Sequence, residues 1–204
     1  LALLGWNSGT EQEIFSLDEL VNIFSIERVN KSGARFDPDK AKWFNHQYLV
    51  KKSDAELAQL YLPIIREKGF EPSLETVTTI TGLVKERVNF VQELWEQSYF
   101  FFEAPSDYDD KVVKKRWKGD VPAFIGEVAA LLETATMWKA EDLKQQVSDL
   151  ITAKEQNFGG VMNALRLALV GGGFGPDLFT IIELLGKNET VSRLRKAVEV
   201  IPAS

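Results

Sequence analysis

The most informative stretch of the sequence is NALRLALVGGGFGPDLFTIIELLGK, residues 163–187. It joins an apolar segment that carries Arg166 to a glycine-rich loop, a proline and a second apolar segment. Glycine supplies the left-handed exit from a helix, and proline favours the first turn of the next one. We therefore expect two helices here, with Pro176 starting the second. A phosphate-binding loop is disfavoured because no Lys-Ser/Thr pair follows the glycines.

Working outward, three helix starts can be assigned from local signals. Ser16 with Glu19, and Ser53 with Glu56, form the pattern of a capping box. Asp37 followed by proline is typical of an N-cap and a first helical residue. The helix that follows residue 53 contains a proline at position 63, where we expect a break or a kink.

The rest of the chain also shows helical spacing of its apolar residues. The run 77–81 is rich in β-branched residues, but its helical periodicity and the preceding Ser73 favour a helix. Similar spacing predicts helices within 121–132, 143–151, 159–169 and 189–201. No segment shows the alternation of a half-buried strand. We therefore predict an all-α helical bundle, with the turn-rich residues 104–110 as a linker.

Composition excludes several kinds of site. The 204 residues are 45% hydrophobic and 26% charged, which is ordinary for a globular protein, and no apolar run is long enough to span a membrane. The chain has no cysteine and a single histidine, His46, so thiolate chemistry and histidine-rich metal sites are excluded. No grouping of acids, nucleophiles or bases indicates a catalytic or metal site.

Charge is unevenly distributed along the chain. The formal net charge of −6 argues against nonspecific nucleic-acid binding, because phosphates are neutralised by basic surfaces. Two segments are nevertheless locally basic, residues 31–52 and residues 111–118. An acidic chain with two local basic segments fits a partner that is bound at a few places.

Three more segments, together with residues 163–187, resemble bacterial glutamyl-tRNA synthetases. They are LALLGW (1–6), EIFSLDELVNIFSIERV (13–29) and FDPDKAKWFNHQYL (36–49). The resemblance implies class I enzymes that attach glutamate to its tRNA with ATP and magnesium, and an α-helical cage that holds the anticodon. The HIGH-like and KMSKS-like ATP signatures occur nowhere in the chain, which begins at Leu1 without a methionine. We therefore expect a C-terminal part of such an enzyme, with no cofactor of its own and no activity alone.

The resemblance also implies which residues lie at the anticodon. In that family, these are the arginine of an LR dipeptide and the loop around a GP dipeptide, which match Arg166, Gly175, Pro176 and Leu178 here. Arg87 lies in a neighbourhood where the family also carries an arginine. The planar fork of donors on Arg166 suits base edges or phosphates, and Pro176 and Leu178 would offer an apolar shelf. The alternative for Arg166 is a solvated or ion-paired arginine.

Other cations are candidates for contacts with the tRNA backbone. The segment KVVKKRWK carries five cations and no anion, at Lys111, Lys114, Lys115, Arg116 and Lys118. It is either a solvated helical face or a phosphate-binding helix whose Trp117 packs or stacks on a base. Lys40 and Lys42, from the basic run 31–52, are further candidates.

These observations predict a domain plan and a function. We expect residues 1–52 to end a region that contacts the tRNA stem, and residues 53–109 and 110–204 to form two anticodon-binding subdomains. The expected partner is glutamate tRNA, bound by a cytoplasmic monomer that makes no contact with membranes. The alternative is a helical protein-interaction module, which differs in whether basic side chains gather on one concave face.

Overall fold

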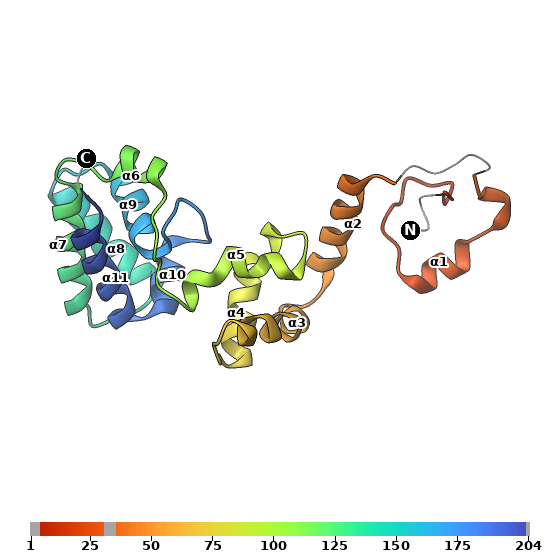
Figure 1. Cartoon of the computed structure of the whole chain (residues 1–204), viewed down its shortest axis with the longest axis horizontal. Coiled ribbons are helices and arrows are strands. Elements are labelled where there is room, and N and C mark those ends of the chain that lie inside the picture. The colour runs from red at the N-terminus through yellow and green to blue at the C-terminus, as the bar shows by residue number, and fades with distance from the viewer. Residues whose placement is uncertain (1–4, 31–35, 203–204) are drawn as a thin grey trace.

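The computed structural model describes residues 5–30 and 36–202, and its regular structure is helical (Figure 1). Within these ranges, the one β feature is an isolated antiparallel bridge between Trp6 and Val29. The all-α prediction is confirmed. Residues 1–4 of LALLGW, and Lys31 and Arg35 of the basic run, lie outside the described residues.

The described elements fall along the chain as α-helices and short 3₁₀ helices, labelled α and η. They are α1 (Leu17–Ile23), η2 (Ile26–Arg28), α2 (Pro38–Lys51), α3 (Asp54–Glu67), α4 (Leu74–Val84), η3 (Lys85–Arg87), η4 (Val91–Glu93), α5 (Leu94–Ser98), η5 (Tyr99–Phe101), α6 (Asp110–Arg116), α7 (Val121–Thr134), α8 (Ala140–Ala153), α9 (Phe158–Val170), α10 (Leu178–Leu185) and α11 (Lys187–Val200).

The three predicted helix starts are confirmed. The side chain of Ser16 accepts a hydrogen bond from the Glu19 N–H, and the Glu19 carboxylate accepts one from the Ser16 N–H. Ser53 and Glu56 repeat this reciprocal pair at the start of α3. Asp37 caps α2 by accepting from two backbone N–H groups. Each cap satisfies donors that the first turn of a helix leaves unpaired.

The predicted break at residue 63 is wrong in one respect, because α3 continues through Pro63 to Glu67. A proline at this position removes the ladder bond to the carbonyl of Gln59. Both Pro63 and Gln59 are exposed, so water can reach the freed carbonyl. Meanwhile the opposite face of α3 buries Leu57, Tyr61 and Ile65, and this packing holds the helix together.

The β-branched run 77–81 lies inside α4, as the helical periodicity predicted. Val77, Ile80 and Val84 are buried against the neighbouring helices, chiefly α3. Tertiary packing therefore outweighs the local preference of these residues for strand.

The helices enclose two separate hydrophobic cores. The first core lies among α2, α3, α4 and α5, and includes Leu57, Tyr61 and Leu94. The second lies among α6 to α11, where α7 and α11 pack closely together. Figure 1 shows α5 leading from the first group of helices to the second, so that the molecule is elongated. Helix α1 lies at the far end from the second core.

Candidate nucleic-acid interface

The glycine-rich loop begins with a left-handed residue at the end of α9. Gly171 has φ of +85° and caps the helix, and its N–H donates to the carbonyl of Leu167. A Cβ atom added to Gly171 would lie 2.7 Å from the backbone oxygen of Asp107. Glycine is thus required by both the conformation and the close approach. The predicted helix-to-helix connection is confirmed.

The carbonyl groups around this loop are held by donors from several elements. The Tyr99 hydroxyl donates to the carbonyl of Val170 at 2.8 Å. The Asp109 N–H donates to the carbonyl of Gly171, also at 2.8 Å. Arg166 holds the far end of the loop. The loop is therefore fixed in shape before any partner binds, which lowers the entropic cost of recognition.

Arg166 uses one arm of its guanidinium to fix the loop. Its Nη1 donates to the carbonyls of Pro176, at 2.7 Å, and Phe174, at 3.1 Å. Burial lowers the pKa of Arg166 from its ordinary value, and the charge of Arg87 lowers it further, while Asp177 opposes the shift. The group remains a cation at neutral pH because the pKa of arginine is so high. Among the described residues, no partner is found for its Nε and Nη2 donors.

Pro176 does not start the next helix, which corrects the expectation from sequence. The N-cap is Asp177, whose side chain accepts from the N–H groups of Phe179 and Thr180, and α10 begins at Leu178. The ring of Pro176 is buried, so its carbonyl group, bound to Arg166, is the part that shapes the loop. Gly175 has φ of +106° and lies against the ring of Phe100 and against Arg166.

A cavity of about 340 Å³ opens beside Arg166, between α8, α9 and the start of α10. It brings together cationic, amide and apolar groups, which suit a nucleobase and its phosphate, and its one carboxylate, Asp177, accepts from backbone N–H groups at the start of α10. The residues that line it are Lys144, Phe158, Met162, Asn163, Arg166, Asp177, Leu178 and Phe179.

Six residues of this cavity were missed by the sequence reasoning: Lys144, Phe158, Met162, Asn163, Asp177 and Phe179. Phe158 is 48% exposed, which is unusual for a large aromatic side chain at a helix start. Phe158 and Met162 precede Arg166 by eight and four residues, so that all three share one face of α9. That spacing was visible in the sequence. Lys144 comes from α8, and no local pattern linked it to this site.

Arg87 lies at the end of η3 with its side chain exposed. Its charge lowers the pKa of Arg166, which places the two guanidinium groups within electrostatic range. Arg87 lies between Val84 and Val88 of the first core, and Arg166 lies on α9 of the second. The structure thus brings together two candidates that are 79 positions apart in sequence.

The basic segment 111–118 forms α6 and the turn after it, beside α9 and the glycine loop. A Cβ atom added to Gly173 would lie 3.7 Å from the side chain of Val112. The four lysines of the segment are exposed and Arg116 is half-buried. Within the described ranges, no carboxylate forms an ion pair with these five cations. Their charge is therefore available to a phosphate backbone.

Trp117 cannot stack on a base, and that part of the sequence reading is wrong. Its side chain is 0% exposed, and its Nε1 donates to the carbonyl of Ile201 at 3.2 Å. The indole anchors the end of α6 to the C-terminal end of α11. Buried tryptophan commonly satisfies its N–H in this way.

Lys40 and Lys42 differ from the cations of α6 because each has a carboxylate partner. Lys40 lies 2.5 Å from Glu13, and Lys42 lies 4.0 Å from Asp39. Helix α2 also lies toward the N-terminal end of the molecule, away from the glycine loop (Figure 1). Any phosphate contact at these lysines would compete with the existing ion pairs.

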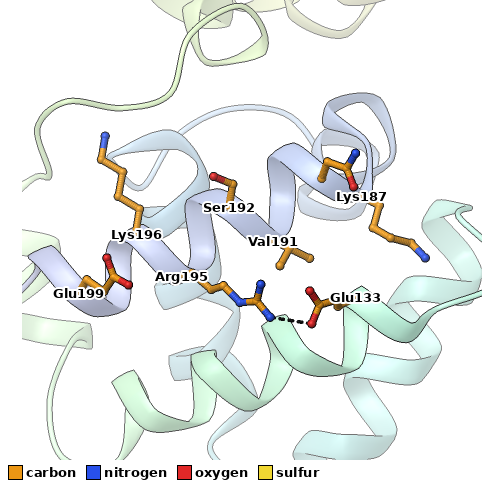
Figure 2. A pocket seen from close by; sticks show the side chains of 8 residues that line it. Glu133, Lys187, Val191, Ser192, Arg195, Lys196 and Glu199 are labelled. Carbon is orange, nitrogen blue, oxygen red and sulfur yellow. Dashed lines mark hydrogen bonds and ion pairs between the residues drawn. The ribbon is translucent and has the colours of Figure 1, made fainter.

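A second hollow, of about 450 Å³, lies between α7 and α11 (Figure 2). Its central arginine, Arg195, is paired with Glu133 at 2.6 Å, and the Lys187 ammonium donates to the carbonyl of Ala135. The exposed Lys196 stands opposite Glu199 on the same helix in Figure 2. Three cations share this hollow with two carboxylates, whereas the five cations of residues 111–118 have no carboxylate partner among the described residues, so this hollow is a poorer match to a polyanion than the surface around α6.

Other kinds of site find no support in the part of the chain that the structure describes. No group of three or more His, Cys, Asp or Glu side chains there could hold a metal ion. No helix in the same residues has the length and apolar character of a membrane span. His46 is half-buried, and its Nδ1 lies 2.7 Å from the carbonyl of Val88, to which it donates.

Solved structures with the same fold are known. A glutamate tRNA ligase from Elizabethkingia meningosepticum, solved in complex with its amino acid, superposes with a TM-score of 0.92 at 39% identity, over 98% of this chain and 40% of that one. A glutamate-tRNA synthetase from Elizabethkingia anophelis gives a TM-score of 0.87 at 39% identity, over 98% of this chain and 39% of that one.

Sequence comparisons give the same picture. Glutamate–tRNA ligases of Porphyromonas gingivalis and Flavobacterium johnsoniae are 51% and 49% identical to this chain over 98% of its length. The chain spans 40% of the length of these relatives. The family profile described as "Anticodon binding domain" matches residues 55–198, which include most of both cores and the glycine loop. The chain therefore belongs to the anticodon-binding domain family.

Proposed function

We propose that this chain is the tRNA-binding part of a glutamate–tRNA ligase and that it recognises the anticodon of glutamate tRNA. The observation that carries the proposal is the surface formed by Arg87, Arg166, the fixed glycine loop and the cavity beside it, with α6 adjacent. Anticodon bases are splayed out when proteins read them, so each needs a pocket with polar edges and flat apolar walls. The cavity offers Arg166 and Asn163 as polar groups, and Phe158 and Leu178 as apolar ones.

The proposed roles divide by chemistry. Arg166 would donate from Nε and Nη2 to a base edge or phosphate, and Arg87 would bind a neighbouring phosphate. Gly175 and Pro176 would act through the backbone, because their carbonyl and φ values shape the loop. The five cations of residues 111–118 would bind the tRNA backbone, with Lys40 and Lys42 as weaker contacts. Backbone contacts fix position, whereas base contacts supply specificity.

Catalysis belongs elsewhere in this proposal. We propose that residues 1–52 end a stem-contact region, and that 53–109 and 110–204 are the two anticodon-binding subdomains. ATP and magnesium would be bound by parts of the ligase outside this chain, which would supply binding energy and positioning. The chain alone would therefore be inactive in aminoacylation. We also propose a cytoplasmic monomer. Relatives named as tRNA ligases lend no support to the protein-interaction alternative.

A binding titration tests the proposal. The full chain is titrated against the anticodon stem-loop of glutamate tRNA and against the same stem-loop with its anticodon replaced. We expect the native stem-loop to bind more tightly, and both affinities to fall steeply as salt rises. Equal affinity for the two RNAs at every salt concentration would refute anticodon recognition by this chain.

A further inference from the structure

Arg193 is an unusual residue in the second core. Its side chain is 3% exposed, and in the described residues it is the one charged side chain that is buried. Nε donates to the Glu189 carboxylate at 2.7 Å, and Nη1 donates to the carbonyls of Phe100 at 2.6 Å and Leu169 at 2.9 Å. Burial of a guanidinium is costly, and in some proteins such a buried charged group specifies one particular arrangement.

The carbonyl of Phe100 belongs to the connector between the two cores, which we define as residues 94–101 of α5 and η5. Leu94 packs in the first core and Phe100 in the second. At the first end, the buried hydroxyls of Ser98 and Tyr61 lie 2.7 Å apart, which ties the connector to α3. At the second end, Arg193 holds Phe100, and the Tyr99 hydroxyl holds Val170. The connector is thus fastened on both sides by buried polar contacts.

The second acceptor of Nη1 links this connector to the recognition loop. Leu169 lies two residues before Gly171, where the glycine loop leaves α9. One guanidinium group therefore joins α11, the connector and the start of the loop that Arg166 completes. A shift of the connector would move Arg87, on the side of the first core, relative to Arg166 in the second.

We infer that Arg193 is a positioning residue that fixes the orientation of the α2–α5 half relative to the α6–α11 half. The fixed orientation keeps Arg87 and Arg166 facing a common partner. The geometric part of this inference is independent of what binds. Its consequence for RNA rests on the proposed function.

The absence of cysteine from the chain permits a direct test. Cysteines are introduced at Ala55 on α3 and Ala130 on α7, both exposed, and labelled with nitroxides. Pulsed electron paramagnetic resonance then reports the distribution of distances between the halves. The variants are Arg193→Lys, Arg193→Met and Tyr99→Phe. The control is Arg195→Met, which removes an arginine of the same helix that forms an exposed pair with Glu133.

We expect one narrow distribution in the unsubstituted chain and in Arg195→Met, and a broadened or displaced one in both Arg193 variants. Lysine should not restore the narrow distribution, because its ammonium group cannot span the three acceptors that the guanidinium of Arg193 reaches. Tyr99→Phe should broaden it less, since Arg193 remains. All samples are measured well below their melting temperatures, so a lowered stability alone leaves the distances unchanged.

A distribution as narrow in Arg193→Lys and Arg193→Met as in the control would overturn the inference. If Arg193→Met does not fold, Arg193→Lys decides the question by the same criterion. In a second arm, Arg193→Lys should weaken binding of the glutamate-tRNA anticodon stem-loop by about 2- to 30-fold, the range typical of coupling through intermediate residues. If the unsubstituted chain does not bind the stem-loop, the proposed function fails, while the distance result still decides the role of Arg193.

Discussion

Arg166→Ala is expected to lower both stability and anticodon discrimination, because the side chain fixes the loop and faces the cavity. The change removes two hydrogen bonds to the carbonyls of Phe174 and Pro176. A charge-assisted bond contributes about 1.5–3 kcal/mol when well buried, and this half-exposed site should retain about 1–3 kcal/mol in total. For a chain of this size, each kcal/mol shifts the melting temperature by about 2–4 °C, so we expect a decrease of about 2–12 °C.

The effect on RNA is separable from the effect on stability. A specific base contact contributes about 1–3 kcal/mol of discrimination, so the affinity ratio between the native and anticodon-replaced stem-loops should fall by about 5- to 150-fold. Arg166→Lys should restore little of the ratio, since a point charge does not reproduce the planar fork. Thermal circular dichroism and fluorescence anisotropy of the full chain measure the two quantities.

A second variant, which changes the loop and keeps the Arg166 side chain, shows whether Arg166 itself contacts the RNA. Gly175→Ala forces a side chain into a position with φ of +106° and distorts the loop while the guanidinium remains. We expect this variant to lose stability and part of the discrimination, because the loop backbone belongs to the proposed interface, but to lose less discrimination than Arg166→Ala. Equal losses for the two stem-loops in Arg166→Ala, or the same loss of discrimination in Gly175→Ala, would refute a direct base contact.

Three further changes test other parts of the structure. Gly171→Ala should lower the free energy of unfolding by at least about 1–2 kcal/mol from the left-handed conformation alone, and the contact with Asp107 adds to this loss. The control Gly159→Ala, in the first turn of α9, has space for its methyl group and should not destabilise the chain. Thermal melts of both variants measure the difference. The double change Lys114→Glu and Lys115→Glu should weaken the binding of all tRNAs alike and reduce the steepness of log affinity against log salt by about 1–2. The same reversal of Lys40 and Lys42, which have carboxylate partners, should change this steepness less. Burial raises the pKa of Tyr61 to about 12. The stability that depends on its neutral hydroxyl is therefore complete below about pH 10 and is lost as the pH rises through 12. Tyr61→Phe should flatten this part of an alkaline denaturation profile.

The helix starts could be predicted from sequence because capping is local. The reciprocal bonds at Ser16 and Ser53 involve residues three positions apart. The predicted break at Pro63 was wrong because proline is disfavoured in a helix interior in general, while its energetic cost depends on whether solvent reaches the freed carbonyl. The prediction that Pro176 starts the helix was wrong because Asp177, a strong capping residue, follows it directly.

The site was only partly predictable. The glycine loop and Arg166 stand within one short stretch, and the resemblance to a family pointed to both. The burial of Trp117 depends on Ile201, 84 residues later, and the contacts of Arg193 reach back 93 residues to Phe100. Neither pairing leaves a periodic or local pattern in the sequence. Lys144 joins the cavity for the same reason, because α8 packs beside α9.

We propose that the anticodon lies in the cavity beside Arg166, and photo-crosslinking can locate it. A glutamate-tRNA anticodon stem-loop with thiouridine in its anticodon is irradiated with the full chain, and the modified peptides are identified by mass spectrometry. The account predicts crosslinks within residues 158–179, from α9 through the glycine loop to the start of α10. Crosslinks confined to the hollow between α7 and α11, or to α1 and α2, would contradict it.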